Sequence, residues 1–170
     1  MTKRTIELVP YSPIWQNIYL RETQCLQKVL RNNLSELHHS GSTAIPSILA
    51  KPTLDVLCAV HTLDGIEAFK DEFAKLGLEF MEENGITGRL FFVRKAKDGI
   101  KHLVHIHIFK AGDERIDDHI DFRDYLNSED EVAKAYEKIK VELKEKHEDN
   151  PALYTAAKNE FIETVLKNIR

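Results

Sequence analysis

The sequence predicts an α/β (α+β) fold, in which a mixed sheet of about five or six strands is flanked by helices and followed by C-terminal helices. Three observations support this prediction. The segment 53–60 is almost entirely apolar, which is typical of a strand buried on both faces. Lys97-Asp98-Gly99 lies between two strand-like runs and indicates a hairpin. Beyond residue 113, apolar residues recur at the spacing of amphipathic helices.

The first elements are a short strand and a long helix. Residues 5–9 have the composition of a strand. Ser12-Pro13 combines a capping hydroxyl with proline at the first helical position, so a helix is expected from there to about Arg31.

The central part should supply the rest of the sheet. Segments 34–40 and 53–60 are expected to be strands, joined by a turn over 43–50. Thr62 is expected to cap a helix that runs through Leu76 and ends at Gly77. The remaining strands are predicted at 78–82, 89–94 and 100–109.

The last third is expected to be helical. One helix is predicted over 114–126. Ser128 and Glu131 have the spacing of a capping box that would begin a second helix. Asn150-Pro151 would begin the final one.

Two charged side chains fall on apolar helix stripes. Glu22 lies in the middle of the apolar arc of the first helix, and Lys158 lies within that of the last. A buried charge requires a partner or a function, so the two residues could pair with each other. Lys158 could instead extend its stem along the core toward solvent. Arg94 is expected in a solvent-exposed hairpin.

Composition limits the functional classes. The chain has 170 residues and a net charge of −4, which suits one domain with a sheet-containing part at about 1–112 and a helical part at about 113–170. This charge argues against a broad nucleic-acid surface but allows a small basic pocket. Membrane-spanning runs and a signal-peptide pattern are absent from the sequence. Cys25 and Cys58 form no disulfide framework, so a cytoplasmic protein is expected.

The connection between the two central strands has the pattern of a phosphate site. Gly41 lacks a Cβ, so the backbone of the Gly41-Ser42 turn can approach a phosphate closely. Backbone amides that follow this turn could face the anion. Asp55 lies in the next apolar strand and could hold a divalent cation against it. Alternatively, Asp55 caps a turn or pairs with Lys51.

A histidine pair forms the second candidate group. Alternation along a strand places His105 and His107 on one face, with their Cα atoms about 7 Å apart. Together with Asp55 they would form a two-histidine, one-carboxylate set, which favours Mn²⁺, Fe²⁺ or Zn²⁺ over Mg²⁺. Alternatively, the two imidazoles are hydrogen-bonded packing residues or donors to a phosphate.

A set of motifs spread over nearly the whole chain resembles the GrpB family, a branch of the nucleotidyltransferase superfamily. The motifs are Gly41-Ser42-Thr43-Ala44-Ile45-Pro46, Leu54-Asp55-Val56, Gly88-Arg89-Leu90-Phe91-Phe92, His105-Ile106-His107, Phe122-Arg123-Asp124-Tyr125-Leu126 and Tyr154-Thr155-Ala156-Ala157-Lys158. The resemblance implies a nucleotidyltransferase-like sheet with a site between strands and C-terminal helices. It also implies eight phosphate- or nucleotide-binding residues: Gly41, Ser42, Thr43, Lys51, Arg89, Arg123, Tyr154 and Lys158.

One departure from the superfamily pattern bears on the reaction. The superfamily places two acids two residues apart on one strand, where they clamp the metal ions of nucleotidyl transfer. Here the position two residues after Asp55 is Leu57, so half of that clamp is missing. Arg123 also has an alternative role, because Asp121 and Asp124 could hold it in surface ion pairs.

These patterns lead to one hypothesis and two alternatives. The hypothesis is a pocket for a small phosphorylated ligand, in the first place a nucleotide, with Asp55, His105 and His107 as catalytic and metal-binding residues. A divalent metal (Mg, Mn or Zn) would then assist nucleotidyl or phosphoryl transfer. The alternatives are a binding module without catalysis and a metalloenzyme of unrelated chemistry. Whether the chain is an enzyme stays open at this level.

Overall fold

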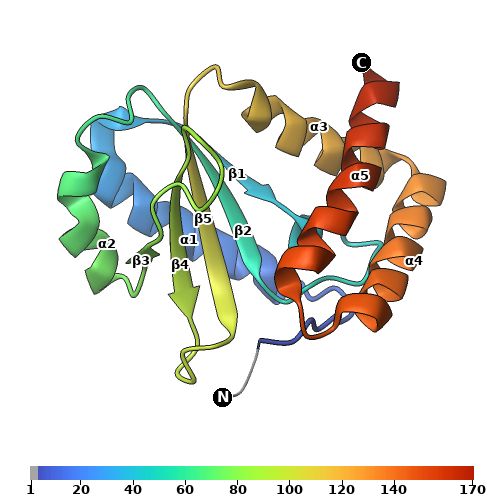
Figure 1. Cartoon of the computed structure of the whole chain (residues 1–170). Coiled ribbons are helices and arrows are strands. Elements are labelled where there is room, and N and C mark those ends of the chain that lie inside the picture. Colours follow the sequence, from blue (N-terminus) through green and yellow to red (C-terminus); the bar gives the residue numbers. More distant parts are fainter. Residues whose placement is uncertain (1–3) are drawn as a thin grey trace.

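The computed structural model describes residues 4–170 and contains one mixed sheet of five strands in the order β1-β2-β5-β4-β3. β2 and β5 are parallel neighbours at its centre, and the other pairs are antiparallel. The strands are β1 (Leu34–Ser40), β2 (Leu54–Val60), β3 (Glu79–Phe80), β4 (Leu90–Lys95) and β5 (His102–Lys110). The arrangement agrees with the mixed sheet and flanking helices predicted from the sequence (Figure 1).

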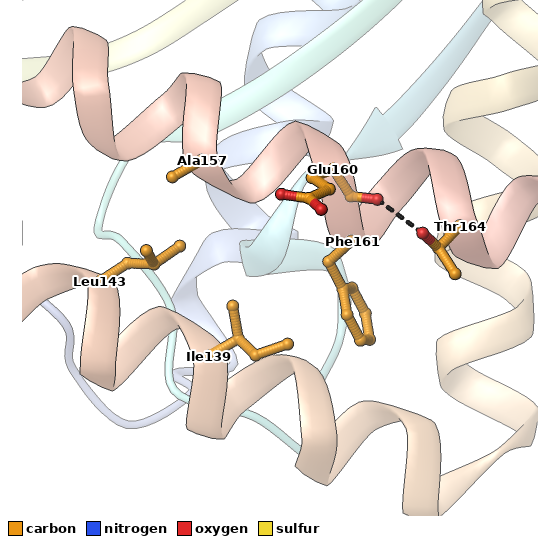
Figure 2. Close-up of a pocket in the computed structure, with 6 residues that line it drawn as sticks. All are labelled: Ile139, Leu143, Ala157, Glu160, Phe161 and Thr164. Carbon is orange, nitrogen blue, oxygen red and sulfur yellow. Dashed lines mark hydrogen bonds between the residues drawn. The ribbon is translucent and has the colours of Figure 1, made fainter.

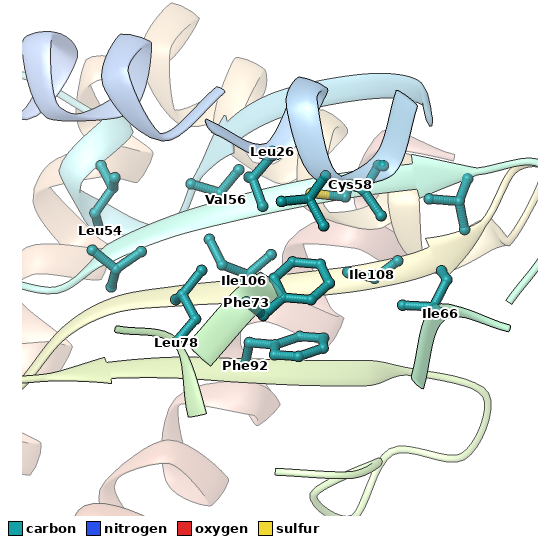
Figure 3. Close-up of a cluster of buried hydrophobic side chains, with 14 of the residues drawn as sticks. Leu26, Leu54, Val56, Cys58, Ile66, Phe73, Leu78, Phe92, Ile106 and Ile108 are labelled. Carbon is teal, nitrogen blue, oxygen red and sulfur yellow. The ribbon is translucent and has the colours of Figure 1, made fainter. Parts of the chain in front are cut away.

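One face of the sheet carries the main hydrophobic core. Helices α1 (Ile14–Leu30) and α2 (Lys70–Lys75) pack against this face, and Figure 1 shows α1 behind the strands. The alternate residues Val56, Cys58 and Val60 of β2 point into this core. Phe92 and Phe73 are fully buried, with ring centroids 4.1 Å apart (Figure 3). Burial of this apolar area is the main source of stability for the sheet.

Three helices follow the last strand and form a second apolar cluster. They are α3 (Glu114–Ser128), α4 (Asp130–His147) and α5 (Pro151–Ile169), which gather on the β1–β2 side of the sheet (Figure 1). Asn150 caps α5 by accepting a hydrogen bond from the Leu153 N–H, as its position before Pro151 predicts. The cluster includes Phe122, Leu126, Tyr136 and Val165 together with Ile45 and Ile48 from the connection after β1.

The opposite face of the sheet is only partly apolar. Leu57, Ala59 and Phe109 pack there against Ile116 of α3. The next positions along the same face of β2 and β5 are Asp55, His105 and His107. Polar side chains therefore occupy one end of this face, beside a small apolar cluster at the other.

Two of the predicted elements differ clearly from the structure. Segment 5–9 forms no strand, because only Val9 makes a bridge, to Ala50. The helix predicted over 62–76 is shorter, since the chain first forms a 3₁₀ turn at Ile66–Phe69 and then α2. Further 3₁₀ turns lie at Arg31–Asn33 and Ser42–Ala44.

The capping box predicted at Ser128 does not form. Helix α3 continues through Ser128, and that hydroxyl donates to the Tyr125 carbonyl instead. Helix α4 starts at Asp130 without a side-chain cap. The sequence pattern was wrong here because the preceding helix extends two residues beyond its predicted end at 126 and uses the serine.

Glu22 has a partner other than Lys158. Its carboxylate accepts two hydrogen bonds from Arg94, one of them at 3.1 Å from Nη2 to Oε2. Arg94 also donates to the Leu76 carbonyl from Nη2 at 2.7 Å and from Nε at 3.0 Å. The prediction that Arg94 lies in a solvated hairpin is therefore wrong, because its side chain turns inward to neutralise the buried acid.

Within residues 4–170, no helix has both the length and the apolar composition that crossing a bilayer requires.

Candidate functional site

The candidate site is built on one row of side chains across three strands. Ser40 of β1 lies opposite Asp55 of β2, and Asp55 lies opposite His105 of β5. Residues directly opposite in a sheet project from the same face, so these side chains are neighbours. His107 is two residues further along β5 and shares that face. The Gly-Ser turn begins immediately after Ser40, which brings it next to Asp55.

Asp55 receives both imidazoles on one carboxylate oxygen. His107 Nε2 lies 2.9 Å from Asp55 Oδ1, and His105 Nδ1 lies 3.3 Å from the same atom. Burial alone would raise the pKa of Asp55, but the hydrogen bonds from His105 and His107 outweigh it and hold the pKa well below the usual range. Asp55 is therefore an anion at neutral pH.

His102 extends the polar group through a local irregularity of the sheet. The register between β4 and β5 shifts at Arg94/Lys95, so an extra residue stands on β5 between His102 and Val104. His102 therefore lies on the same face as His105, with its Nδ1 2.8 Å from His105 Nε2. Burial lowers the pKa of both rings, that of His102 to about 4. Simple alternation along the strand would place His102 off this face.

Arg89 closes the other end of the group. Its Nη1 lies 3.2 Å from His107 Nδ1, and its guanidinium covers the Phe91 ring at 4.4 Å. The side chain is 5% exposed. Burial and the nearby charge of Arg115 lower the pKa of Arg89 to about 10, so it remains a cation at neutral pH.

Gly41 is required where it stands for two reasons. Its φ of 71° lies in the left-handed region that favours glycine. A methyl group at this position would lie 2.5 Å from Asp55 Oδ2. The hydroxyls of the next two residues serve the turn itself: Ser42 accepts from the Lys51 N–H at 3.2 Å, and Thr43 lies 2.8 Å from His39 Nε2. The Ser42 hydroxyl keeps its own hydrogen, so it can still donate to a ligand together with the backbone of the turn.

Cations outnumber acids around Asp55. Burial, together with the charges of Lys158 and Arg4, lowers the pKa of Lys51 to about 8, although the charge of Asp55 opposes this shift. The charge of Asp55 also acts on Arg4 and Arg89. It partly offsets the lowering of their pKa values by burial. Three basic residues thus interact with the charge of one carboxylate, a fourth acts on Lys51, and a positive surplus of this kind favours an anionic ligand.

The fit of these residues to a metal ion is uneven. One ligand atom from each of Asp55, His105 and His107 lies within 4.8 Å of the others, so the group could hold a metal ion. A ligating imidazole normally donates its second N–H to an acceptor. His105 satisfies this condition, because His102 Nδ1 can accept from it. His107 does not, because the group behind it is the donor Arg89.

Among the predicted binding residues, Arg123 is engaged elsewhere and Tyr154 is buried. Arg123 donates to the His39 carbonyl at 2.9 Å and to Asp124 at 2.7 Å, so its predicted pairing with a neighbouring acid is present. Tyr154 is 1% exposed, and its hydroxyl has no hydrogen-bond partner within the described chain. Lys158 is half-buried, with its Nζ 5.0 Å from the Tyr154 ring centroid.

The sequence alone did not identify several side chains near the site. Ser40 is 1% exposed, faces the same side as Asp55, and its hydroxyl lacks a partner among residues 4–170. The His119 ring of α3 lies 5.8 Å from that of His107, and burial lowers its pKa to about 4. Ser40 immediately precedes the Gly-Ser turn, which is a usable signal, whereas the position of His119 depends on tertiary packing.

Helix α4 also grips the chain just before Lys51. Glu137 accepts a hydrogen bond from the Leu49 N–H, and Lys140 Nζ donates to the Leu49 carbonyl. Lys140 is 1% exposed. Burial and the charge of Lys158 lower its pKa to about 7. Its helical position gave no sign of this contact, because the partner is a backbone carbonyl far away in the sequence.

Two surface hollows lie away from the Asp55 group. A groove of about 380 Å³ runs between α4 and α5, and Figure 2 shows its apolar lining. It is lined by Ile139, Leu143, Ala157, Glu160, Phe161 and Thr164. The second hollow, of about 350 Å³, lies between α1 and β1. Neither contains a candidate site residue, so the site is identified by its chemistry and not by concavity.

Comparison with known proteins agrees with the fold and the motifs. The family model described as "GrpB protein" matches residues 5–168. Protein YqkA of Bacillus subtilis is 33% identical over 168 residues, which are 99% of this chain and 48% of that protein. The chain thus spans about half the length of that relative. Glutamate-rich protein GrpB of Alkalihalophilus pseudofirmus is 31% identical, with coverage of 99% of this chain and 98% of that protein.

Solved structures extend the comparison. The crystal structure of conserved protein GrpB from Enterococcus faecalis has a TM-score of 0.85 and 30% identity, covering 96% of this chain and 99% of that one. The Cid1 poly(U) polymerase has a TM-score of 0.60 at 11% identity, covering 88% of this chain and 49% of that one. The second likeness concerns the fold alone, which is that of nucleotidyltransferases.

Proposed function

This chain belongs to the GrpB family, and we propose that it binds a phosphorylated small molecule, in the first place a nucleotide, at the Asp55 group. The observation that carries the proposal is the surplus of cations there: Arg4, Lys51 and Arg89 each interact with the charge of Asp55, and Lys158 acts on Lys51. A phosphate group would neutralise this surplus by charge-assisted hydrogen bonds.

Two further features support an anion at this place. Gly41 lets the turn backbone lie directly against the Asp55 carboxylate, which fills the space of the missing Cβ, so the turn amides stand beside the cations of this group. The buried Ser40 hydroxyl, unpaired within the described residues, could donate to a phosphate oxygen beside Asp55. The ligand would thus meet backbone and hydroxyl donors on one side and lysine and arginine side chains on the other.

The structure also bears on the reaction. Leu57, at the position of the second superfamily acid, is fully buried in the apolar cluster under α3. Two-metal nucleotidyl transfer requires more carboxylates than Asp55 alone supplies. We therefore favour ligand binding over nucleotidyl or phosphoryl transfer as the basic activity. A divalent metal centre at Asp55, His105 and His107 is the second candidate, supported by the closeness of their ligand atoms.

The test is a binding screen by calorimetry and thermal unfolding. ATP, GTP, CTP, UTP and pyrophosphate are titrated at pH 7, once with EDTA and once with Mg²⁺ or Mn²⁺. We expect one of them to bind in EDTA, and at a thousand times its dissociation constant it should stabilise the fold by about 4 kcal/mol. Lys51→Gln should weaken this binding at least tenfold, because it removes a cation from the site.

The controls separate an anion site from a metal site. Lys134→Gln changes an exposed lysine that is paired with Glu131 and should leave binding unchanged. Asp55→Asn removes the only acid of the group, so binding in EDTA should be kept or strengthened. Loss of all binding in Asp55→Asn, or binding only with a divalent metal, would support the metal centre instead. No binding of any of the five compounds would overturn the proposal.

A further inference from the structure

Arg89 fixes the proton on His107. Arginine carries only donors, so the contact at 3.2 Å from Nη1 makes His107 Nδ1 an acceptor. A neutral imidazole has one N–H, which must then be on Nε2. That N–H points at Asp55 Oδ1, 2.9 Å away, and donates to it. The three residues therefore form a directed chain of hydrogen bonds.

This direction opposes metal binding at His107. A metal takes the lone pair of a ring nitrogen, so a metal at Nε2 would require the proton on Nδ1, facing the Arg89 donor. His105 is under no such constraint. The nitrogen behind it is His102 Nδ1, at 2.8 Å, which can accept as well as donate.

Arg89 cannot easily turn away from His107. Its Nε and Nη2 donate to the Glu83 carbonyl at 3.3 and 3.1 Å, and Nη2 also donates to the Asn84 carbonyl at 3.1 Å. Phe91 lies under the guanidinium plane. The loop that supplies these carbonyls is closed by a hydrogen bond of 2.7 Å from the Gly88 N–H to the Glu83 carboxylate. The guanidinium is thus held on three sides, and of the two N–H groups left on Nη1 one faces His107.

We propose that Arg89 is a specificity-determining residue: it keeps His107 as an N–H donor, so that the site accepts an anion and does not use His107 to bind a divalent transition metal. Removing its donors would convert the same residues into a two-histidine, one-carboxylate metal site. The inference concerns the site of the proposed function, but it does not require that a nucleotide binds there.

The first test measures metal binding directly. Co²⁺ is titrated into the wild type, Arg89→Gln, His107→Ala and Arg89→Gln/His107→Ala, without nucleotide, and binding is followed by the visible absorption of the ion. A glutamine carbonyl can accept from His107 Nδ1, so we expect Arg89→Gln to bind Co²⁺ at least tenfold more tightly than the wild type. His107→Ala should abolish this gain in the double variant.

A matched control separates the donor from the charge. Arg115 acts on Arg89 through its charge, but its own side chain bonds Asp113 and the Thr87 carbonyl. Arg115→Gln should therefore change Co²⁺ affinity less than threefold. An equal gain in both single variants would mean that only charge matters and would overturn the proposal. So would no gain in Arg89→Gln, or a tenfold loss of wild-type affinity on His107→Ala alone.

A second measurement uses the wild-type protein, and variants are needed only to assign the His107 resonances. Imidazole ¹⁵N chemical shifts distinguish the two neutral tautomers, and His107 in the metal-free wild type should carry its proton on Nε2. A proton on Nδ1 would contradict the proposal even if Arg89→Gln fails to fold. Because neither experiment contains nucleotide, a failure here differs from a failure of ligand binding, which the EDTA titrations report.

Discussion

The two faces of the central sheet are built from the same strands but differ in how completely their side chains are satisfied. Toward α1 and α2, β2 presents Val56, Cys58 and Val60 to a continuous apolar core. Toward α3, the alternate positions present Asp55 and then Leu57 and Ala59. On the first face, the apolar side chains all pack against one another in this core. The second leaves the Ser40 hydroxyl without a partner in the described chain and holds more cations than acids.

This difference separates stability from function. Packing on the apolar face recovers the free energy of burying side chains, so its residues are explained by the fold. Buried charges on the polar face cost free energy unless they are paired or serve a ligand. Substitutions on the first face should therefore act on unfolding alone, and those on the second should also act on binding.

The largest effect is expected on the apolar face. Phe92→Ala should lower the free energy of unfolding by about 4 kcal/mol, because Phe92 is fully buried and packs against the rings of Phe73 and Phe80. Urea unfolding measures this loss. Leu103→Ala, at a residue that is 39% exposed on β5, should cost less than about 0.5 kcal/mol. A loss below about 1 kcal/mol in Phe92→Ala would break the contrast between the two faces.

The next effect concerns the polar face, at the close contact between Gly41 and the Asp55 carboxylate. Gly41→Ala should cost about 2 kcal/mol, from the left-handed backbone and from contact with the Asp55 carboxylate. Gly65→Ala is the control for a positive φ alone, because Gly65 has a φ of 78° and a ψ of −5° with no atom within 4 Å of the added methyl group, whereas Gly41 has a ψ of −174°. Gly41→Ala should also weaken nucleotide binding, and Gly65→Ala should not. Equal costs would show that the carboxylate contact contributes nothing.

The smallest effect concerns a buried cation on the helical side. The pKa of Lys140 is lowered to about 7 in the fold, against 10.5 as its ordinary value, so the unfolded chain binds more protons between these values. Stability should therefore rise with pH in this range, by about 1 kcal/mol from pH 7 to pH 8 relative to Lys140→Met. Urea unfolding of both proteins at the two pH values measures the difference. A difference that stays constant, or that falls with pH, would contradict the assignment.

Patterns of period two and strong turn signals predicted most of the sheet. β1 was expected at 34–40 and found there, and β2 was displaced by one residue at its start. Period two also placed His105 and His107 on one face, where both meet Asp55. Local signals failed where the tertiary structure did not support them. Segment 5–9 has strand composition, yet no strand pairs with it beyond the bridge at Val9.

Partners of charged side chains were less predictable, because they depend on contacts between distant segments. Glu22 was recognised as a buried acid from its helical phase, but its partner Arg94 lies on a strand 72 residues away. His102 joins the site only through the irregular register of β5, which no spacing rule reveals. The direction of the hydrogen bond between Arg89 and His107 likewise follows from three-dimensional placement, not from either motif.

The grip of α4 on Leu49 has a mechanical consequence. Glu137 and Lys140 are three residues apart on one helix face and hold both polar groups of the same residue. Lys51 is two residues further along the chain, so it is tethered to α4 by a very short link, whereas Asp55 is anchored in the sheet. Any rotation of the helical layer against the strands would therefore carry this ammonium group with it and change the width of the gap that an anion must bridge.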